Sequence, residues 1–298
     1  MQPPIAQAMR AISITSRDNP HVKAWRRLAQ ESHAWRKQGL LWLEGEHLCS
    51  VARERPVWPV QALVLSQTRW EADEAAHWLA LPPASAKAAP AEHPKPLPPP
   101  VYVLPDALFA HVSGLESPAG LAYIAQCPQA QTVRTGVATV VLDRLQDAGN
   151  VGAVLRCAAA FGFTQVVALR GSAGLFSPKV LRAGMGAHAS LHLVEQAGVD
   201  EVRALNVPLL LTSSHRGQYL HRAVQEHTLP WPCAWVLGHE GQGVAPDLEA
   251  LPHTPVRIAQ PGGQESLNVA TAAAICLHAS AALALESRQE RLPVKDAV

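Results

Sequence analysis

Three short segments in the second half of the chain carry most of the residues that could do chemistry. They span residues 143–152, 238–243 and 258–268, and each combines glycines with polar or charged side chains. The first two directly follow apolar runs that predict buried strands. In open α/β sheets, ligands bind beyond the carboxyl ends of the strands. The three segments are therefore predicted to meet at one edge of a sheet.

Two residues of the first segment and its helix invite a functional interpretation. Asn150 is predicted to cap a helix over 151–161. Arg156 lies in that helix among alanine, valine, leucine and cysteine residues, so the sequence predicts a buried guanidinium that needs a partner. A purely structural interpretation also stands, with Asn150 acting only as a cap and Arg156 only pairing with a nearby acid.

The second segment, Gly238-His239-Glu240-Gly241-Gln242-Gly243, matches neither of two common phosphate-binding patterns. It is not GxxxxGK[ST], and it is not GxGxxG, which counts against P-loop NTPases and dinucleotide-dependent dehydrogenases. A nucleotide hydrolase is disfavoured further, because the chain has neither a phosphate-binding lysine motif nor paired metal carboxylates.

The five cysteines, Cys49, Cys127, Cys157, Cys233 and Cys276, form no CxxC pair. This excludes zinc ribbons and thioredoxin-like sites, and it predicts a reducing compartment. The histidines show no ligand spacing, so no metal is expected, and Cys157 has no evident base that would make it a catalytic thiol. The start of the sequence shows no secretory signal, and no apolar run approaches the ~18 residues of a membrane span. We expect a cytoplasmic protein with no membrane partner.

Apolar runs alternate with helical patterns from residue 137 onward, which predicts an α/β fold with a parallel sheet and helices on both faces. The predicted strands of this half are 137–142, 165–169, 208–212 and 234–237, and its helices are 151–161 and 268–285. The first half has predicted strands over 39–46, 60–65, 101–103 and 121–125, with a helix over 47–55.

A chain of 298 residues predicts two domains. We place the first over 1–128, with a proline-rich insertion at about 82–100, where proline favours an extended exposed segment. A polar linker follows over 129–136. The second domain spans 137–288, and a short tail covers 289–298.

Basic residues are concentrated at the start of a chain that is almost neutral overall, with 25 Lys and Arg against 24 Asp and Glu. This balance disfavours a protein that coats polyanions by net charge alone. Residues 1–38 hold seven basic side chains against two acidic ones. The candidates for contact with RNA phosphates are Arg17, Lys23, Arg26, Arg27, Arg36 and Lys37. Trp25 and Trp35 lie between them, either as platforms for exposed bases or as the buried face of a helix.

Together the three segments resemble motifs 1, 2 and 3 of the SpoU/TrmH family of SPOUT RNA methyltransferases. The specific signals are the Gly-x-Glu-Gly loop at 238–241 and the tripeptide Ser266-Leu267-Asn268. The resemblance covers about 137–283, and residues 177–187 look like the connecting segment of the family. Through residues 41–45 and 117–122, the first half is similar to the ribosomal-protein (L30e-like) substrate-binding domain that many members carry.

The resemblance implies an α/β protein with a knotted (trefoil) parallel-sheet SPOUT domain, preceded by the smaller α/β L30e-like domain. It also implies S-adenosyl-L-methionine as the cofactor, held in a bent form largely through backbone groups. The cofactor-binding positions that it implies are Gly238, Ile258, Leu267, Thr212, Gly243 and Gln260. Glycine allows close approach of a backbone, and Ile and Leu suit the faces of an adenine ring.

The activity that the resemblance implies is methylation of a ribose 2′-hydroxyl of RNA by a homodimer, with the active site completed near the subunit interface. The implied catalytic residues are Arg156, Asn150, Glu240, Ser266 and Asn268. We interpret Arg156 as an electrostatic stabiliser of the attacking oxygen and the adjacent phosphate, because arginine stays protonated and becomes a base only under strong perturbation. The other four would orient Arg156 and brace the loops, and a Glu240–Arg156 pair would satisfy the buried guanidinium.

The chain departs from the family pattern at three positions. Ala148 and Ala259 stand where proline is frequent, which loses rigidity without removing a functional side chain. His239 replaces a smaller or amide residue, and we expect it to face water rather than to touch substrate.

The sequence therefore predicts an rRNA-modifying enzyme, with rRNA favoured over tRNA and the first half binding structured RNA. The alternative is a non-catalytic RNA-binding or ribosome-assembly protein with the same fold. The joint presence of the five implied catalytic residues argues against that alternative.

Overall fold

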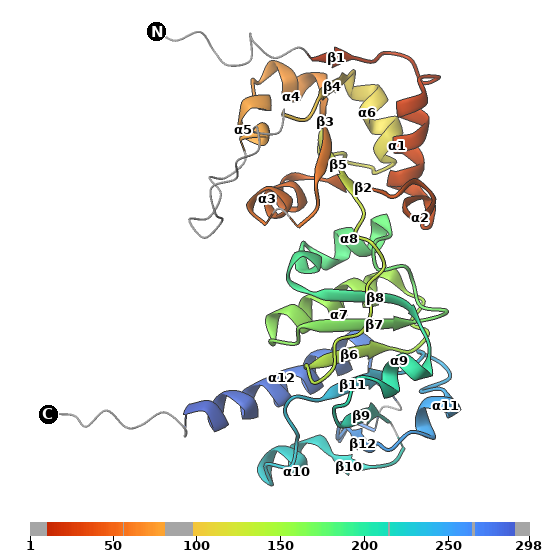
Figure 1. Cartoon of the computed structure of the whole chain (residues 1–298), viewed down its shortest axis with the longest axis vertical. Coiled ribbons are helices and arrows are strands. Elements are labelled where there is room, and N and C mark those ends of the chain that lie inside the picture. Colours follow the sequence, from red (N-terminus) through yellow and green to blue (C-terminus); the bar gives the residue numbers. More distant parts are fainter. Residues whose placement is uncertain (1–10, 56, 81–97, 214, 264–265, 290–298) are drawn as a thin grey trace, which may run out of the picture. The chain divides into compact units, whose positions relative to one another are not determined.

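The structure is a computed structural model that describes residues 11–55, 57–80, 98–213, 215–263 and 266–289 (Figure 1). The expectations for the proline-rich stretch up to residue 97 and for the tail from residue 290 concern residues outside these ranges. The chain divides into two compact units. Unit 1 comprises residues 1–129 and 176–189, and unit 2 comprises residues 130–175 and 190–298.

Unit 1 is built on a mixed sheet with the strand order β1-β4-β3-β5-β2. Its strands are β1 (Ile12–Ser13), β2 (Leu40–Glu44), β3 (Val60–Ser66), β4 (Val101–Leu104) and β5 (Leu121–Gln126). β4 runs parallel to β1 and β3, whereas β5 runs antiparallel to β3 and β2. The four strands predicted for this half are confirmed, and the two-residue edge strand β1 was not predicted.

Unit 1 also contains short helices, and the last of them comes from the separate stretch 176–189 rather than from a connection between its strands. They are α1 (Pro20–Gln30), α2 (Ala34–Gln38), α3 (Glu46–Glu54), α4 (Gln67–Glu71), α5 (Ala75–Leu79), α6 (Asp106–Ser113) and α8 (Pro178–Gly184). The 3₁₀ helix η2 (Ala187–Ser190) follows α8 along the chain. α1 begins with Asn19, whose side chain accepts a hydrogen bond from the His21 N–H, and with Pro20 in its first turn.

A buried carboxylate joins the two stretches on which the resemblance of unit 1 rests. Glu44, at the end of β2, is 7% exposed and accepts hydrogen bonds from Trp42 Nε1 at 2.8 Å and Ser113 Oγ at 2.7 Å. It also accepts one from the Ala119 N–H at 3.3 Å. Three donors satisfy the charge, which could not otherwise be buried without a large loss of free energy.

Unit 2 holds a seven-stranded sheet in the order β10-β12-β9-β11-β6-β7-β8, and every pairing in it is parallel. Its strands are β6 (Thr139–Leu142), β7 (Gln165–Leu169), β8 (His192–Ala197), β9 (Leu209–Thr212), β10 (Gln218–Tyr219), β11 (Ala234–Leu237) and β12 (Thr254–Arg257). The predicted parallel sheet is confirmed. β8, β10 and β12 were not predicted.

Helices cover both faces of this sheet, as Figure 1 shows. The helices of unit 2 are α7 (Ala148–Ala160), α9 (Val199–Arg203), α10 (Leu220–Gln225), α11 (Pro246–Glu249) and α12 (Val269–Gln289). Val236 of β11 packs in a cluster with Val202 of α9 and Leu248 of α11. Its neighbour Trp235 points to the opposite face, where Nε1 donates to Ser280 Oγ of α12 at 2.9 Å. The residues before β6 also belong to this unit, since Arg134 N–H donates to the Gln165 side chain at 2.7 Å.

α12 corrects one expectation from the sequence. Residues Val269–Ser287 form a helix long and apolar enough, by length and composition, to cross a membrane. The prediction that no apolar run approaches this length was therefore wrong. α12 contacts α7, α10 and β11, and only 28% of its apolar window is buried inside the structure. One face of the helix belongs to the core of unit 2, and apolar side chains on another face remain exposed.

The Glu44 network yields a stability prediction. Glu44→Gln keeps the size of the side chain but places an amide donor among three donors, so it should lower the free energy of unfolding by about 2 kcal/mol or more. Glu46→Gln is the matched control, because its carboxylate is 61% exposed in an ion pair with Arg69 and should contribute less than about 1 kcal/mol. Urea unfolding followed by tryptophan fluorescence measures both. Equal losses in the two variants would contradict the role given to Glu44.

Candidate functional site

The carboxyl ends of four neighbouring strands bring the three polar segments together. β12, β9, β11 and β6 are adjacent and parallel, so they all end at one edge of the sheet. The first segment follows Leu142 of β6, the second follows Leu237 of β11, and the third follows Arg257 of β12. Thr212 ends β9 between the last two. The predicted meeting of the three segments at one edge is confirmed.

Asn150 joins all three segments. Its Nδ2 donates to Glu240 Oε1 at 3.3 Å, and its Oδ1 accepts from Asn268 Nδ2 at 3.0 Å. Asn150 is partly exposed, and Glu240 and Asn268 are exposed. One amide thus uses a donor and an acceptor to connect the loops after β6 and β11 with the start of α12. Three of the five implied catalytic residues form a single hydrogen-bonded chain.

Two helix caps explain how these amides are held. Asp147 is the N-cap of α7, and its Oδ1 accepts from the Asn150 N–H at 2.7 Å. The prediction that Asn150 caps the helix was wrong. Because a carboxylate already caps α7, the Asn150 side chain is free to reach the other loops. Asn268 does cap its helix, since Oδ1 accepts from the Ala270 and Thr271 N–H groups at 2.9 and 3.2 Å.

Arg156 is exposed, so the predicted buried guanidinium was also wrong. The apolar neighbours of Arg156 in sequence, such as Val154 and Leu155, face the core, whereas the arginine lies on the outer face of α7. Among the described residues Arg156 forms no ion pair, and Glu240 is bonded to Asn150 instead. Ser266 is exposed as well. The guanidinium is therefore open to an external anion.

The loop after β11 is closed on itself. His239 N–H donates to Gly243 O at 3.0 Å, and Gly243 N–H donates back to His239 O at 2.9 Å. A Cβ on Gly238 would overlap the backbone of Gly243 and Val244, so only glycine fits there. His239 Nδ1 accepts from the N–H groups of Gly241 and Gln242 at 3.0 and 3.2 Å. We expected the His239 ring simply to face water, but its Nδ1 stabilises the turn through these two hydrogen bonds. Nδ1 is therefore not free to contact substrate.

An ion pair that the sequence reasoning missed holds this loop to β6. Asp143 has a side chain only 2% exposed and accepts from Arg144 Nε at 2.9 Å and Arg144 Nη2 at 3.1 Å. Its Oδ2 also accepts from the Ala245 N–H at 2.7 Å. Arg144 Nη1 donates to Gln242 Oε1 at 2.9 Å, and Nη2 donates to Gly243 O at 3.2 Å. The sequence could have indicated this ion pair, because an aspartate and an arginine directly follow the buried strand β6.

Backbone strain at Arg144 accompanies these contacts. Its φ of +58° lies in the left-handed region, which is uncommon for a residue other than glycine. The hydrogen bond with Asp143 raises the pKa of Arg144, and the negative charge of Asp143 raises it further. Burial of the guanidinium acts in the opposite direction but does not cancel the rise. The conformation persists because the guanidinium gains several acceptors in this position.

The residues implied for cofactor binding surround the same edge. Ile258 is partly buried, Leu267 is 38% exposed, and Gly243 has a φ of +68°. Thr212 Oγ1 donates to Val236 O at 3.1 Å and so links β9 to β11. Gln260 Oε1 is buried, and within the described residues it has no hydrogen-bond partner. Partly exposed apolar side chains and an unsatisfied amide oxygen in the segment that follows β12 suit a ligand with an apolar ring and a hydrogen-bond donor.

The six basic candidates fall in two places in unit 1. Arg17 precedes α1, and Lys23, Arg26 and Arg27 lie on α1, whereas Arg36 and Lys37 lie on α2. All six are exposed. Trp25 and Trp35 are 4% and 7% exposed, so the interpretation of them as platforms for bases was wrong. They form the buried face, with the Trp25 ring 5.0 Å from that of Tyr102.

Other chemistry finds little support in the described part of the chain. No group of three or more histidine, cysteine, aspartate or glutamate side chains there could hold a metal ion. Burial raises the pKa of the Cys157 thiol above its ordinary value, which disfavours a reactive thiolate in α7.

Comparison with known proteins gives consistent matches. Residues 138–278 match the SpoU rRNA Methylase family. The chain is 29% identical over 270 residues to 23S rRNA (guanosine(2553)-2′-O)-methyltransferase RlmP of Bacillus subtilis, covering 89% of this chain and 97% of that protein. It is 32% identical over 280 residues to the uncharacterised tRNA/rRNA methyltransferase slr1673 of Synechocystis, covering 89% and 92%.

Solved structures show the same architecture. A TrmH-family protein from Porphyromonas gingivalis is 28% identical and superimposes with a TM-score of 0.69 over 88% of this chain and 97% of its own. An rRNA methyltransferase from Sinorhizobium meliloti, solved with AdoMet bound, has 22% identity and a TM-score of 0.72 over 95% and 99%. The second likeness is one of fold.

The Asp143–Arg144 pair yields a prediction about the loop after β11. Asp143→Asn removes the charge that binds Arg144 and weakens the acceptor of the Ala245 N–H, so amide exchange at Ala245 should speed up about tenfold. Hydrogen–deuterium exchange with mass spectrometry of peptides covering 238–245 measures this.

Asp147→Asn is the control, because asparagine also caps helices and Asp147 does not touch the loop. Unchanged exchange at Ala245 in Asp143→Asn would show that the pair does not hold the loop.

Proposed function

Because this chain belongs to the SpoU rRNA methylase family, we propose that it transfers a methyl group from S-adenosyl-L-methionine to a ribose 2′-hydroxyl of rRNA. The relative RlmP, which matches over nearly its whole length, is named as an enzyme of this kind. The observation that carries the proposal is the bonded chain of Glu240, Asn150 and Asn268 at the edge where β6, β11 and β12 end.

The edge residues fit the cofactor. When bound, S-adenosyl-L-methionine would supply an electrophilic methyl group on its sulfonium. Transfer would break the S–CH3 bond, form the ribose O–CH3 bond, leave S-adenosyl-L-homocysteine and release the hydroxyl proton to solvent. Ile258 and Leu267 offer apolar contact for an adenine ring, and the Gln260 side-chain oxygen needs a donor. The closed Gly238–Gly243 loop presents a fixed backbone, held by the Asp143–Arg144 pair. A loop fixed in advance loses little conformational entropy on binding.

Arg156 and the bonded chain act on the acceptor. A ribose hydroxyl is a poor nucleophile, so the site must stabilise negative charge as it develops on the attacking oxygen. The exposed Arg156 guanidinium supplies a compensating positive charge and binds the adjacent phosphate. Asn150, Glu240 and Asn268 fix the loops around the acceptor, and Ser266 lies exposed beside Asn268 to meet it.

A homodimer is part of the proposal. α12 exposes Ile275 by 39% and Leu285 by 59%, whereas another face of the helix packs into unit 2. Ile275 and Leu285 are ten residues apart in α12, a spacing that places both side chains near the same face of the helix, together with His278. An apolar helix face of this kind fits a second copy of the chain, with the active site completed near the interface.

The family trefoil knot and a cytoplasmic location complete the proposal. The likeness of the chain to a TrmH-family structure supports the knot that the family resemblance implies. Cys49, Cys233 and Cys276 are buried as free thiols, which supports a reducing compartment. As proposed, the chemistry uses protein side chains and the cofactor, without a metal ion.

Methyl transfer is tested with purified protein, labelled S-adenosyl-L-methionine and RNA from cells that lack this gene. Alkali cleaves RNA only beside a free 2′-hydroxyl, so label should appear in alkali-resistant dinucleotides from rRNA. Arg156→Ala should lower kcat by at least about a hundredfold, because it removes charge stabilisation at the attacking oxygen. Cofactor affinity, measured by calorimetry, should stay within a few-fold of wild type.

Label in mononucleotides would point to base methylation and overturn the assigned acceptor. No label, together with no cofactor binding, would favour a non-catalytic RNA-binding protein. Full activity of Arg156→Ala would remove that residue from the reaction.

The dimer is tested by sedimentation equilibrium. Wild type should sediment as a dimer, and Leu285→Asp should shift it toward monomer, because a buried unpaired carboxylate is costly. Glu286→Gln, on the next residue, should leave the dimer intact. A monomeric wild type at micromolar concentration would contradict the proposed assembly.

A further inference from the structure

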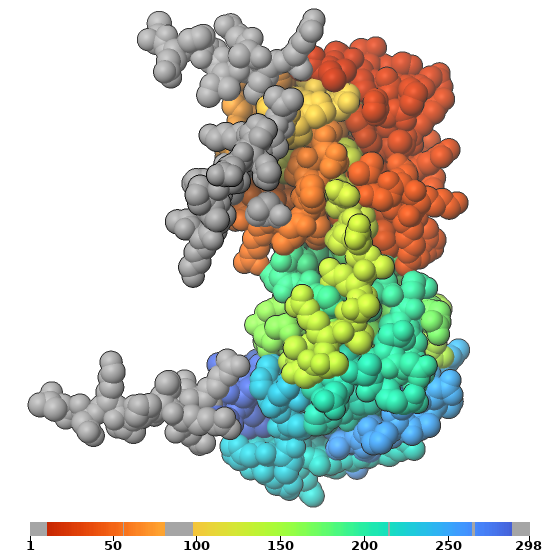
Figure 2. All heavy atoms as spheres, viewed as in Figure 1, coloured from red at the N-terminus to blue at the C-terminus, as the bar shows by residue number. Residues whose placement is uncertain are grey.

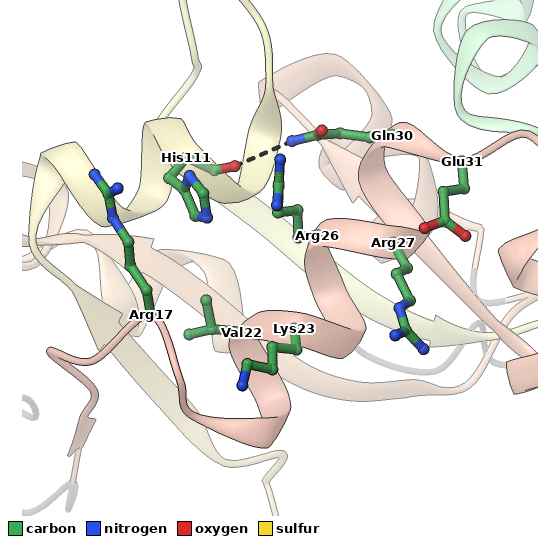
Figure 3. A pocket seen from close by; sticks show the side chains of 8 residues that line it. All are labelled: Arg17, Val22, Lys23, Arg26, Arg27, Gln30, Glu31 and His111. Atoms are coloured by element: carbon green, nitrogen blue, oxygen red, sulfur yellow. Dashed lines mark hydrogen bonds between the residues drawn. The ribbon is translucent and has the colours of Figure 1, made fainter.

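Unit 1 contains a basic hollow between α1 and α6. Its volume is about 330 Å³, enough for about ten water molecules. The residues that line it are Arg17, Val22, Lys23, Arg26, Arg27, Gln30, Glu31 and His111 (Figure 3). We call it the α1–α6 hollow. Four of its lining residues are cations and one is a carboxylate. α1 lies at the surface of this unit, in red in Figure 2.

The charges of the hollow have few partners within the protein. Among the described residues, Arg17, Arg26 and Arg27 form no ion pair, and Lys23 reaches only the exposed Asp18 at 2.9 Å. α1 has no acidic residue in its first turn. Lys23 lies three and four positions before Arg26 and Arg27, a spacing at which like charges on a helix repel one another. Such an arrangement is unfavourable for α1 alone and becomes favourable when an anion binds.

The hollow is built on helices that are fixed to each other. Gln30 Nε2 donates to the carbonyl oxygens of His111 and Val112, both at 3.0 Å, which ties the end of α1 to the last turn of α6. Gly114, with a φ of +68°, ends α6, and a Cβ there would press on the Gln30 side chain. Val22, 1% exposed, belongs to the buried side of α1. The cations therefore project from a rigid support.

His111 reports the electrostatic field inside the hollow. Figure 3 shows its ring between Arg17 and Arg26. Burial of the ring, together with the positive charges of Arg26 and Arg17, lowers the pKa of His111 below its ordinary value. The ring thus favours its neutral form, and the arginines carry the positive charge of this part of the hollow.

The lining distinguishes a phosphate from a base. Bases of unpaired RNA are bound by stacking on exposed aromatic rings. Among the described residues, His111 has the only ring that lines the hollow, and Trp25 and Trp35 are buried. Arginine forks and lysine instead match phosphate oxygens. Paired RNA presents its phosphates on the outside and is recognised chiefly through them and the 2′-hydroxyls.

We infer that the α1–α6 hollow is a binding site for the phosphate backbone of a paired RNA stem, through Arg17, Lys23, Arg26 and Arg27. This inference rests on the proposed function in taking RNA as the substrate. It names the part of the substrate that unit 1 holds, which is a helical stem rather than an unpaired loop. Arg36 and Lys37 lie outside the hollow, so they are not part of this site.

The test compares a labelled RNA hairpin with an unpaired strand of equal length by fluorescence anisotropy, over a series of KCl concentrations. Each lost phosphate contact should reduce the slope of log K against log [salt] by about 0.9. Arg17→Gln/Arg26→Gln in the full chain should therefore give a slope about 1.8 shallower and bind the hairpin about tenfold more weakly. The unpaired strand should lose much less.

Two single variants serve as a test in the opposite direction and as a control. Glu31→Gln removes the carboxylate of the lining and should tighten hairpin binding by about twofold to threefold. Arg203→Gln removes one positive charge on α9, where the arginine is 63% exposed and pairs with Asp200, and should leave hairpin binding unchanged. In the methylation assay the double variant should raise KM for RNA and keep kcat at saturating RNA.

The outcomes separate this inference from the proposed function. Wild-type affinity and slope in the double variant would overturn the site, and equal losses for hairpin and unpaired strand would overturn its preference for a stem. Absence of methylation by wild type, with hairpin binding that still depends on Arg17 and Arg26, would remove the proposed function and leave the hollow as an RNA site.

Discussion

The parallel pairing of β12, β9, β11 and β6 is the constraint on which the candidate site depends. Parallel strands end at the same edge, so loops that are far apart in sequence must leave the sheet side by side. Asn150 and Asn268 are 118 residues apart and still share a hydrogen bond of 3.0 Å. No single loop contains a complete site, because each contributes one side chain to a bonded chain that exists only when the strands are in register.

The loop after β11 shows how this edge is made rigid. Its own hydrogen bonds close it, Gly238 permits that closure, and Arg144 ties it to β6 through Gln242 and Gly243. Asp143 is nearly inaccessible to water, so its charge is compensated by Arg144 and the Ala245 N–H rather than by solvent. Removing Arg144 would leave the buried Asp143 carboxylate without its ion-pair partner, whereas the Arg144 side chain is 30% exposed to water. The pair therefore fixes the position of the loop.

The sequence predicted the strands that are buried on both faces, because their runs are continuously apolar, as in Val140, Val141 and Leu142. It missed β8 and β10 at the edges of the sheet and β12 beside β10, where residues such as His192, Glu195, Thr254 and Arg257 interrupt the apolar pattern. The three site segments were found from their glycines and polar residues. The contacts between these segments were harder to predict from the sequence. Asp147 and Asn150 are both residue types that cap helices well, and only the backbone conformation determines which of them caps α7. Arg156 was misplaced because neighbours in sequence are not neighbours in a helix, where Val154 and Leu155 turn inward and Arg156 turns out.

Charge is used differently in the two units. In unit 2 each charge at the edge that the loops share is either neutralised locally, as in Asp143 and Arg144, or left exposed, as in Arg156. In unit 1 the cations of α1 repel one another, and among the described residues their one ion pair joins Lys23 to the exposed Asp18. Repulsion among these cations lowers the stability of the free protein slightly. An RNA phosphate bound between them would make their net electrostatic energy favourable. Because the whole chain carries almost no net charge, such a local concentration attracts RNA to one surface without general affinity for polyanions. As proposed, the affinity for RNA and the chemistry on ribose are carried by separate sets of side chains, so altering one set should leave the other function in place.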